Sequence, residues 1–188
     1  MKTYILPSLK LTGILILICS ILYPLLIAGI AKAAPGGGKG ETIELNGKVV
    51  GYALIGQNFT DESYFTGRPS AVDYNAAGSC GSNKGPSNPD YLALVQSRID
   101  TFLVHNPGVQ RSEIPADLVT ASSSGLDPDI SVQAAKVQVR RIAKARNLAE
   151  PLLNQLIENQ TEEPLFEVFG TKKINVLKLN IELNKLSR

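Results

Sequence analysis

The hydrophobic pattern of the chain begins with one long apolar run. Between Lys10 and Lys32 every residue from Leu11 to Ala31 is uncharged, and most are Leu or Ile. As a helix this run is about 31 Å long, which matches the hydrocarbon core of a bilayer. Because lipid offers no hydrogen bonds, a single spanning segment must be helical. The pattern predicts a short tail over residues 1–10 and a transmembrane helix over residues 11–31, kinked at Pro24.

A cleaved signal peptide is the alternative interpretation of this run. Ala31-Lys32-Ala33 has the small-x-small form of a cleavage site. The apolar part of a signal peptide, however, is only about 7–15 residues long, and this run is longer. We therefore favour a retained membrane anchor.

After the apolar run the pattern becomes short and irregular. Residues 32–46 contain a Gly-rich stretch and predict a flexible linker. Residues 48–59 (KVVGYALIGQNF) are β-branched and aromatic and predict a strand. Residues 65–89 and 115–129 are rich in Gly, Pro and Ser, which indicates two long loops of the kind that usually carries function.

Three helices are expected between and after these loops. Asn88 and Pro89 fit the N-cap and first position of a helix that reaches about residue 104. Ser131 fits the cap of a helix over residues 132–147, and Pro151 opens a third. Apolar residues recur at helical spacing in all three, at Leu92, Val95, Ile99 and Phe102, at Val132, Ala135, Val139, Ile142 and Ala143, and at Leu152, Leu153, Leu156 and Ile157.

The C-terminal pattern fits two structures. Apolar residues alternate with polar ones over residues 177–183, which favours a strand. The same region also has apolar residues at helical spacing, so a helix stays open, at Val176, Leu179, Leu183 and Leu186. The predicted fold class is α/β, with one N-terminal transmembrane helix followed by a single mixed α/β soluble domain over residues 47–188.

Charge and metal-ligand counts exclude several functions. Three of the 19 basic residues precede Pro35 and none of the 17 acidic residues does, so the domain is close to neutral. A neutral domain is not typical of a nucleic-acid partner. One His and two Cys exclude zinc fingers and ribbons, and we expect no metal site.

No complete catalytic motif is present in the sequence. It contains neither a G-x-x-x-x-G-K-[ST] phosphate loop nor an Asp-Lys-Thr-Gly-Thr phosphorylation sequence. Residues 121–125 (ASSSG) imitate a nucleophile elbow centred on Ser123. The sole histidine, His105, precedes this serine, against the order expected for that fold. A membrane-anchored extracytoplasmic serine hydrolase using Ser123 therefore remains only as the alternative function.

The helix expected over residues 132–147 carries five cations and no acid, at Lys136, Arg140, Arg141, Lys144 and Arg146. Such a cluster can bind phosphates, a nucleotide or an acidic partner, and it can equally be a solvated helix face. Gln138 lies among these cations, where it is either a ligand contact or an ordinary surface residue. We take Lys136, Gln138, Arg140 and Arg141 as candidate nucleotide or partner contacts.

Several long segments together resemble a known family. They are GYALIGQNF at 51–59, YFTGRPSA at 64–71, GSN at 81–83, DLVTASSSGLD at 117–127, RIAKARNL at 141–148 and NVLKLN at 175–180, with Tyr-Pro-Leu at 23–25. In sequence and in order they resemble the C subunit of the Kdp-type potassium-transporting ATPase. The chain departs from the family pattern at Cys80, before Gly81, and at Val132, after Ile130-Ser131. Neither change removes a charge.

The resemblance implies an accessory subunit in the cell (inner) membrane that is not catalytic by itself. Its expected partners are a channel-like subunit that holds the potassium path and a P-type ATPase subunit that hydrolyses ATP. The family's C subunit is described as a catalytic chaperone that raises the nucleotide affinity of the ATPase subunit. The chain would then have no cofactor of its own, and ATP would be bound with the ATPase subunit.

The side of the membrane on which the soluble domain lies affects how it could fill this role. Lysines flank the apolar run on both sides, so the positive-inside rule hardly discriminates. We favour an extracytoplasmic domain, which cannot touch ATP and must act through a coupling free energy. The two polar loops are then the expected docking surface, with candidates Arg68, Asp117, Ser123 and Asp127. Alternatively, Arg68 pairs with an acid inside the domain and Asp127 forms a turn before Pro128.

Overall fold

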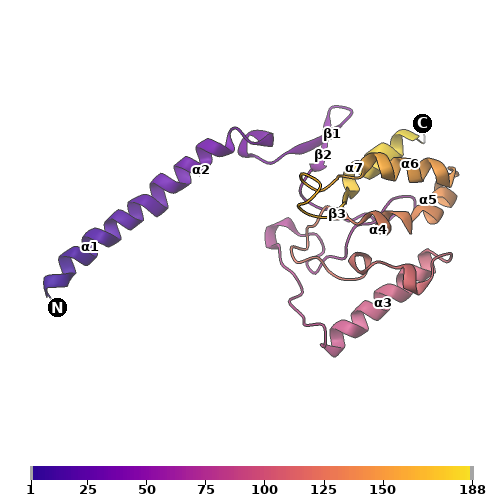
Figure 1. Ribbon diagram of the computed structural model, residues 1–188, viewed down its shortest axis with the longest axis horizontal. Helices are drawn as coiled ribbons and strands as arrows, with labels where there is room; N and C mark the ends of the chain where they lie inside the picture. Colours follow the sequence, from indigo (N-terminus) through magenta and orange to yellow (C-terminus); the bar gives the residue numbers. More distant parts are fainter. Residues whose placement is uncertain (1, 187–188) are drawn as a thin grey trace. The chain divides into compact units, whose positions relative to one another are not determined.

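The computed structural model describes residues 2–186. The chain divides into two compact units, Met1–Thr42 and Ile43–Arg188, each with its own internal packing (Figure 1). The first unit is the apolar helical segment, and the second is the α/β domain.

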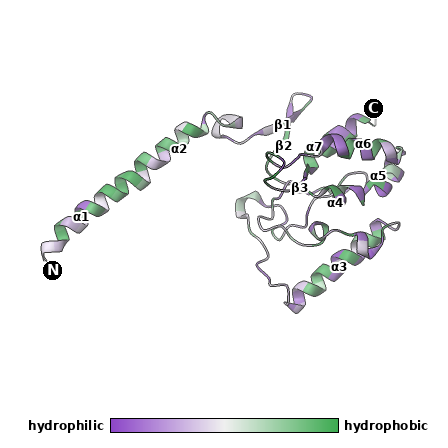
Figure 2. Cartoon of the chain, in the orientation of Figure 1, coloured by the Kyte–Doolittle hydropathy of each residue, from purple (hydrophilic) through white to green (hydrophobic). Residues whose placement is uncertain are grey.

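The apolar segment forms one helical rod made of α1 (Lys2–Leu17), a π-helical turn (Ile18–Leu22) and α2 (Tyr23–Ala31). Its stretch Thr3–Ala31 is long and apolar enough to cross a membrane, and none of its most apolar window is buried within the chain. Figure 2 shows hydrophobic residues along most of this rod. The helix begins at Lys2, so the described part of the predicted tail continues the helix.

Pro24 widens the helix instead of ending it. Proline lacks an N–H group, and its ring clashes with the carbonyl group four residues earlier, here that of Ser20. Ser20 lies in the middle of the π-helical turn, a form that often relieves such local strain. The flanking Leu22 and Tyr23 keep helical backbone angles, so the rod continues through the proline (Figure 1).

The domain begins with a hairpin of β1 (Thr42–Leu45) and β2 (Lys48–Tyr52), joined by Asn46 and Gly47. Both turn residues have positive φ, as the tight hairpin turn requires. β1 lies within the range predicted as a flexible linker, which also contains a 3₁₀ turn (Pro35–Gly38). The strand predicted to reach residue 59 ends at Tyr52, because the chain turns there and buries Ala53.

Four helices form the core of the domain: α4 (Val132–Lys136), α5 (Val139–Arg146), α6 (Glu150–Gln160) and α7 (Val176–Leu186). Helix α6 packs against each of the other three (Figure 1). Two short antiparallel strands, β3 (Asp129–Ile130) and β4 (Ile174–Asn175), close one side. The fully buried large side chains include Phe65, Ile142, Leu153, Ile157, Ile174, Leu179 and Leu183.

Two of the predicted elements differ in the structure. The helix expected over residues 132–147 is divided into α4 and α5 by a turn at Val137 and Gln138. The strand favoured over residues 177–183 is wrong, since this region forms helix α7. The helical spacing prevails there because Val176, Leu179 and Leu183 are all buried in the core.

Three predicted helix starts are confirmed. The Asn88 side chain accepts a hydrogen bond from the N–H of Tyr91 at the start of α3 (Pro89–His105), and that of Ser131 accepts one from the N–H of Ala134 at the start of α4. Pro151 lies in the first turn of α6. Of the apolar residues expected at helical spacing on α3, Val95, Ile99 and Phe102 are half-buried and Leu92 is exposed, and of these Phe102 packs against the core cluster.

The two predicted long loops are present, interrupted only by 3₁₀ turns at Ala76–Gly78 and Ala116–Leu118 in the described chain. The first loop is fixed at its start by Phe65. The backbone N–H of Phe65 donates to Asn180 Oδ1, and Asn180 Nδ2 donates to the carbonyl of Phe65, both at 2.9 Å. Helix α7 therefore holds the YFTGRPSA segment in place by two buried hydrogen bonds.

Candidate functional site

Gln138 connects the turn between α4 and α5 to the first loop. Its amide oxygen accepts from the backbone N–H of Thr66 at 2.8 Å, from the Thr66 hydroxyl at 3.0 Å and from Arg141 at 2.8 Å. Its amide nitrogen donates to the carbonyl groups of Thr66 and Ala134, at 3.2 and 3.0 Å. The bond to Ala134 competes with the helical ladder, which is consistent with the helix dividing here.

Arg141 extends this network toward α3. Its guanidinium donates to Asn106 Oδ1 at 3.1 Å, to the carbonyl of Tyr64 at 3.0 Å and to the carbonyl of Glu62. Burial lowers the pKa of Arg141, and the nearby charges of Glu62 and Asp61 oppose that shift. The arginine therefore fastens residues 62–64 to the helical core.

These contacts correct the prediction for two residues. Gln138 is fully buried and each polar atom of its amide is bonded within the domain, so it is not the surface residue that the sequence suggested. A nucleotide or partner would reach it only after this network opened. Arg141 is likewise turned inward, and both residues position the loop.

The five-cation cluster is divided by the fold. Arg146 joins Arg141 on the inner side, with its Nε donating to the carbonyl of Ser63 at 2.6 Å and its guanidinium 4.5 Å from the centre of the Tyr64 ring. Lys136, Arg140 and Lys144 are exposed and have no hydrogen-bond or ion-pair partner among residues 2–186. These three cations are the exposed ones of the cluster, and Arg141 also lines the two cavities beside them.

Two of the exposed cations, Arg140 and Lys144, border a cavity of the domain. It has a volume of about 600 Å³ and lies between the end of α3, residues 106–109 and helix α5, with Arg140 and Lys144 in its wall. A Cβ atom on Gly108 would lie 2.4 Å from a guanidinium nitrogen of Arg140, so the arginine lies directly against this glycine. The opposite wall carries His105, whose Nδ1 is 2.7 Å from Glu62 Oε1.

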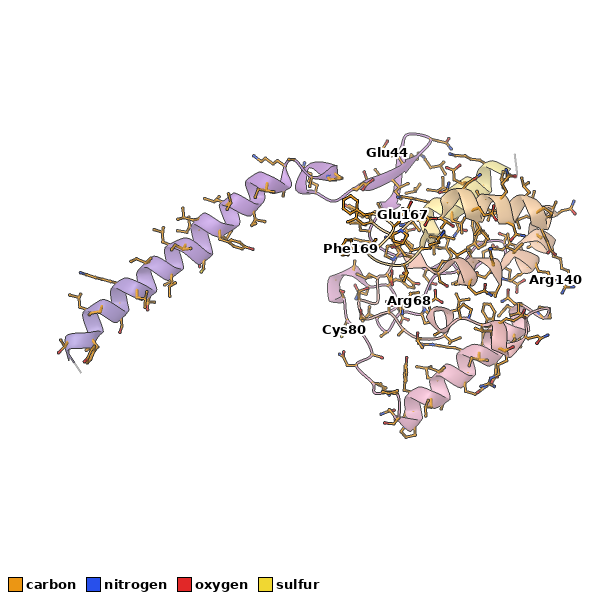
Figure 3. All side chains as sticks on the ribbon, in the orientation of Figure 1. Glu44, Arg68, Cys80, Arg140, Glu167 and Phe169 are labelled. Carbon is orange, nitrogen blue, oxygen red and sulfur yellow. The ribbon has the colours of Figure 1, made fainter. Side chains whose placement is uncertain are left out.

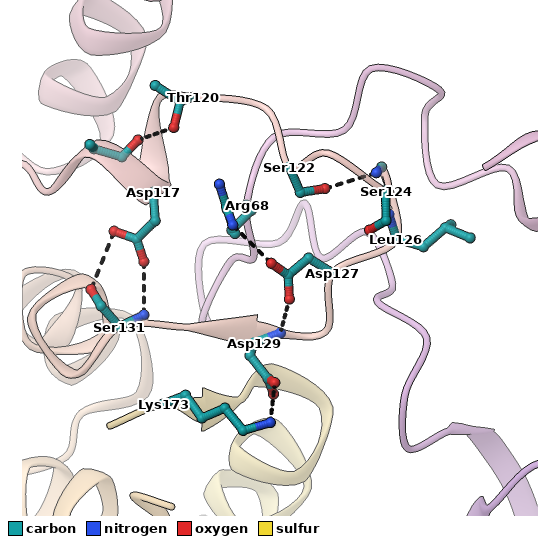
Figure 4. Close-up of polar contacts among 12 residues, drawn as sticks. Arg68, Asp117, Thr120, Ser122, Ser124, Leu126, Asp127, Asp129, Ser131 and Lys173 are labelled. Atoms are coloured by element: carbon teal, nitrogen blue, oxygen red, sulfur yellow. Dashed lines mark hydrogen bonds and ion pairs between the residues drawn. The ribbon is translucent and has the colours of Figure 1, made fainter. Parts of the chain in front are cut away.

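The two polar loops are held together by an ion pair. Arg68 contacts Asp127 at 2.9 Å, and the other oxygen of Asp127 accepts from the N–H of Asp129 at 3.0 Å (Figure 4). The Tyr74 hydroxyl donates to the carbonyl of Arg68. Burial, reinforced by the charge of Asp127 and opposed by that of Arg68, raises the pKa of Tyr74 to about 12.

Three of the loop residues predicted to dock on a partner make contacts inside the domain, and their docking role stays a prediction. Arg68 and Asp127 use their charges on each other and on the loop backbone, as the internal-pair alternative expected. Asp117 accepts from the N–H of Ser131 at 2.8 Å and from its hydroxyl at 3.2 Å, so it fixes the start of α4 (Figure 4). Ser123 alone is exposed.

The geometry does not assemble a serine hydrolase site. The hydroxyl of Ser123 has no hydrogen bond within the described residues. His105 is instead paired with Glu62, and neither of the two cavities that it borders includes Ser123 among its lining residues. The nucleophile and base of the alternative function are not brought together.

A comparison with protein families agrees with the resemblance seen in the motifs. Residues 5–185, almost the whole chain, match the family model described as K⁺-transporting ATPase, c chain. The chain belongs to this family. Its hydrogen-bonded segments at 64–71 and 117–127 are those that carried the resemblance.

Curated relatives of this C-subunit chain bear one name, potassium-transporting ATPase KdpC subunit. A relative from Flavobacterium psychrophilum is 57% identical over 178 residues, which cover 95% of this chain and 96% of the relative. One from Bacteroides fragilis is 51% identical and covers 99% and 98% of the two chains. One from Bacillus cereus is 47% identical and covers 96% and 94%.

Three residues that organise the C-subunit site were missed in the sequence. They are Thr66, Asn106 and Asn180, all uncharged polar residues within or next to apolar stretches. Asn180 lies between Leu179 and Ile181, and a polar residue at a helical position that faces the core is the only signal that could have indicated its role.

We predict that Gln138→Leu destabilises the C-subunit domain by roughly 2–4 kcal/mol, because it leaves Thr66 and Arg141 with unpaired buried polar groups. Urea unfolding followed by circular dichroism measures this. The control is Gln133→Leu on the exposed side of α4, which should change stability by less than about 0.5 kcal/mol. Equal effects of the two substitutions would contradict the role of Gln138.

A second prediction concerns alkaline pH. Folding raises the pKa of Tyr74 from 10.0 to about 12, so the folded state holds this proton more tightly than the unfolded state. The resulting stabilisation is complete below pH 10 and is lost as the pH rises through about 12. The free energy of unfolding of the wild type should fall more steeply over this interval than that of Tyr74→Phe. Parallel pH profiles would refute the raised pKa.

Proposed function

We propose that this potassium-transporting ATPase subunit is non-catalytic, assembles with the channel-like and P-type ATPase subunits of the pump, and raises the nucleotide affinity of the ATPase subunit. The supporting observation is the helix Thr3–Ala31, 29 residues long, whose apolar side chains find no cover within the chain. Such a surface needs lipid or the helices of other subunits around it.

The apolar helix offers places for close approach by another helix. A Cβ atom added to Gly13 or Gly29 would meet no heavy atom within 4 Å. Small residues of this kind let membrane helices pack closely, since their backbones can come near each other. Assembly within the bilayer would link this subunit to the helices that carry the potassium path.

In the domain, the exposed cations Lys136, Arg140 and Lys144 are the proposed contact for a partner. Their charges are unpaired within the described residues, and the cavity beside Arg140 and Lys144 gives a partner side chain a place to enter. If the domain is extracytoplasmic, the contact is an acidic surface of the channel-like subunit. An effect on ATP, which remains bound to the ATPase subunit, then passes through the complex as a coupling free energy.

We predict that Arg140→Gln/Lys144→Gln raises the apparent KM of the assembled pump for ATP by roughly tenfold, since two charged contacts are lost. Potassium-stimulated ATP hydrolysis measures this, and co-purification of the partner subunits checks assembly. The matched control is Lys48→Gln/Lys84→Gln, which removes two exposed charges elsewhere in the domain. An intact complex with an unchanged KM would exclude this contact.

A further prediction tests the side of the membrane. Cys80 is exposed in the domain, whereas Cys19 lies in the apolar helix. A membrane-impermeant maleimide should label Cys80 in sealed right-side-out vesicles, and Cys80→Ser should abolish the labelling. Labelling that occurs only after the vesicles are made permeable would place the domain in the cytoplasm instead.

A further inference from the structure

The connection between α6 and β4 contains an exposed apolar turn, residues 165–169 (LFEVF), which is called the tip below. The four apolar side chains of the tip are 65–80% exposed: Leu165 by 65%, Phe166 by 80%, Val168 by 73% and Phe169 by 68%. Side chains of this size are normally covered, and a contiguous exposed apolar patch usually marks a binding surface.

The backbone of the tip is bonded to itself. Leu165 and Phe169 exchange two hydrogen bonds, at 3.1 and 2.9 Å, and the N–H of Glu167 donates to the carbonyl of Pro164 at 2.9 Å. Phe166 and Glu167 adopt positive φ angles of 54° and 60°, so the turn projects its side chains outward at some conformational cost. Because these backbone groups are already hydrogen-bonded to each other, they would not lose hydrogen bonds if the tip moved from water into lipid.

Strand β4, which follows the tip in the chain, is hydrogen-bonded to the segment just after β2, near the N-terminal end of the domain. Asn175 in β4 donates to the carbonyl of Ala53, just after β2, at 2.7 Å. The next residue, Leu54, is 75% exposed. Figure 3 shows Glu44 of the entering hairpin on the same side of the domain as Glu167 and Phe169 of the tip.

The chain length limits how far this side of the domain can move from the bilayer. Residues 32–42 connect the end of α2 to the domain unit, and at most about 40 Å separates the two ends of such a segment. The domain is therefore tethered to the membrane by a short segment, and tethering of this kind strengthens even a weak contact through a high effective concentration.

The size of the tip favours lipid over a protein partner. A stable protein interface buries about 800 Å² on each partner and needs about 20–30 residues a side, far more than four side chains provide. Insertion into lipid has no such threshold, because each buried apolar side chain contributes separately. Glu167 has no ion pair within the described chain and limits insertion to the interfacial zone.

We propose that the tip, residues 165–169, inserts into the interfacial region of the same bilayer that holds the N-terminal helix. The base of the tip remains in water, because Lys172 pairs with Glu163 at 2.8 Å and Lys173 with Asp129 at 2.6 Å. The domain would thus have a second attachment, which fixes its orientation on the membrane.

Spin labels on the full chain in phosphatidylethanolamine–phosphatidylglycerol vesicles test this. In a Cys19→Ser/Cys80→Ser background, one label is placed at Val168→Cys and a control label at Val104→Cys, an equally exposed site on α3. Collisions with oxygen, which concentrates in lipid, are compared with collisions with a water-soluble nickel chelate. The oxygen-to-nickel ratio should be severalfold higher at 168 than at 104. Equal ratios would overturn the proposal.

Two further measurements distinguish insertion into lipid from contact with a protein. Phe166→Ser/Phe169→Ser should lower the inserted fraction at 168 by about tenfold for each phenylalanine removed, whereas Leu92→Ser/Leu94→Ser on α3 should leave it unchanged. In the assembled pump, the label at 168 should stay accessible to oxygen. Shielding from both oxygen and nickel in the assembled pump would show a protein occupant and overturn the proposal.

Discussion

The buried amide of Gln138 is the contact on which the arrangement of the domain depends. A fully buried polar side chain destabilises a fold unless its donors and acceptors are paired, and here Thr66, Ala134 and Arg141 pair them all. The dependence runs in both directions. The Gln138 amide needs Thr66 of the first loop to pair its polar atoms, and these hydrogen bonds in turn fix the path of the loop. Asn180 fixes the same loop one residue earlier, at Phe65.

This constraint also determines which charges remain for other subunits. Arg141 and Arg146 are half-buried and donate to the backbone of residues 62–64, whereas Lys136, Arg140 and Lys144 are exposed. The ion pair of Arg68 and Asp127 similarly joins the two polar loops to each other. In this chain the segments at 64–71 and 117–127 therefore make hydrogen bonds and an ion pair within the domain.

The chain itself does not cover the apolar window of the rod, and the described residues of the domain do not bring Ser123 and His105 to one cavity. The uncharged run over residues 11–31 matches the length of the hydrocarbon core, and the helix Thr3–Ala31 that contains it is long and apolar enough to cross a membrane. The domain contributes the exposed cations Lys136, Arg140 and Lys144 and the cavity beside two of them. In the proposed function, the influence on the pump's chemistry travels through contacts with other subunits, as a difference in affinity between conformational states.

The sequence by itself determined the features that depend on neighbouring residues. The apolar run indicated the spanning helix, and Asn88, Ser131 and Pro151 indicated three helix starts, because capping and proline effects act within one turn. Only the tertiary structure decided the burial of Gln138, the division of the cations and the helix at residues 176–186, where alternation had favoured a strand. Each of these depends on partners far along the chain, such as Thr66 for Gln138 and Phe65 for Asn180, which local patterns do not contain.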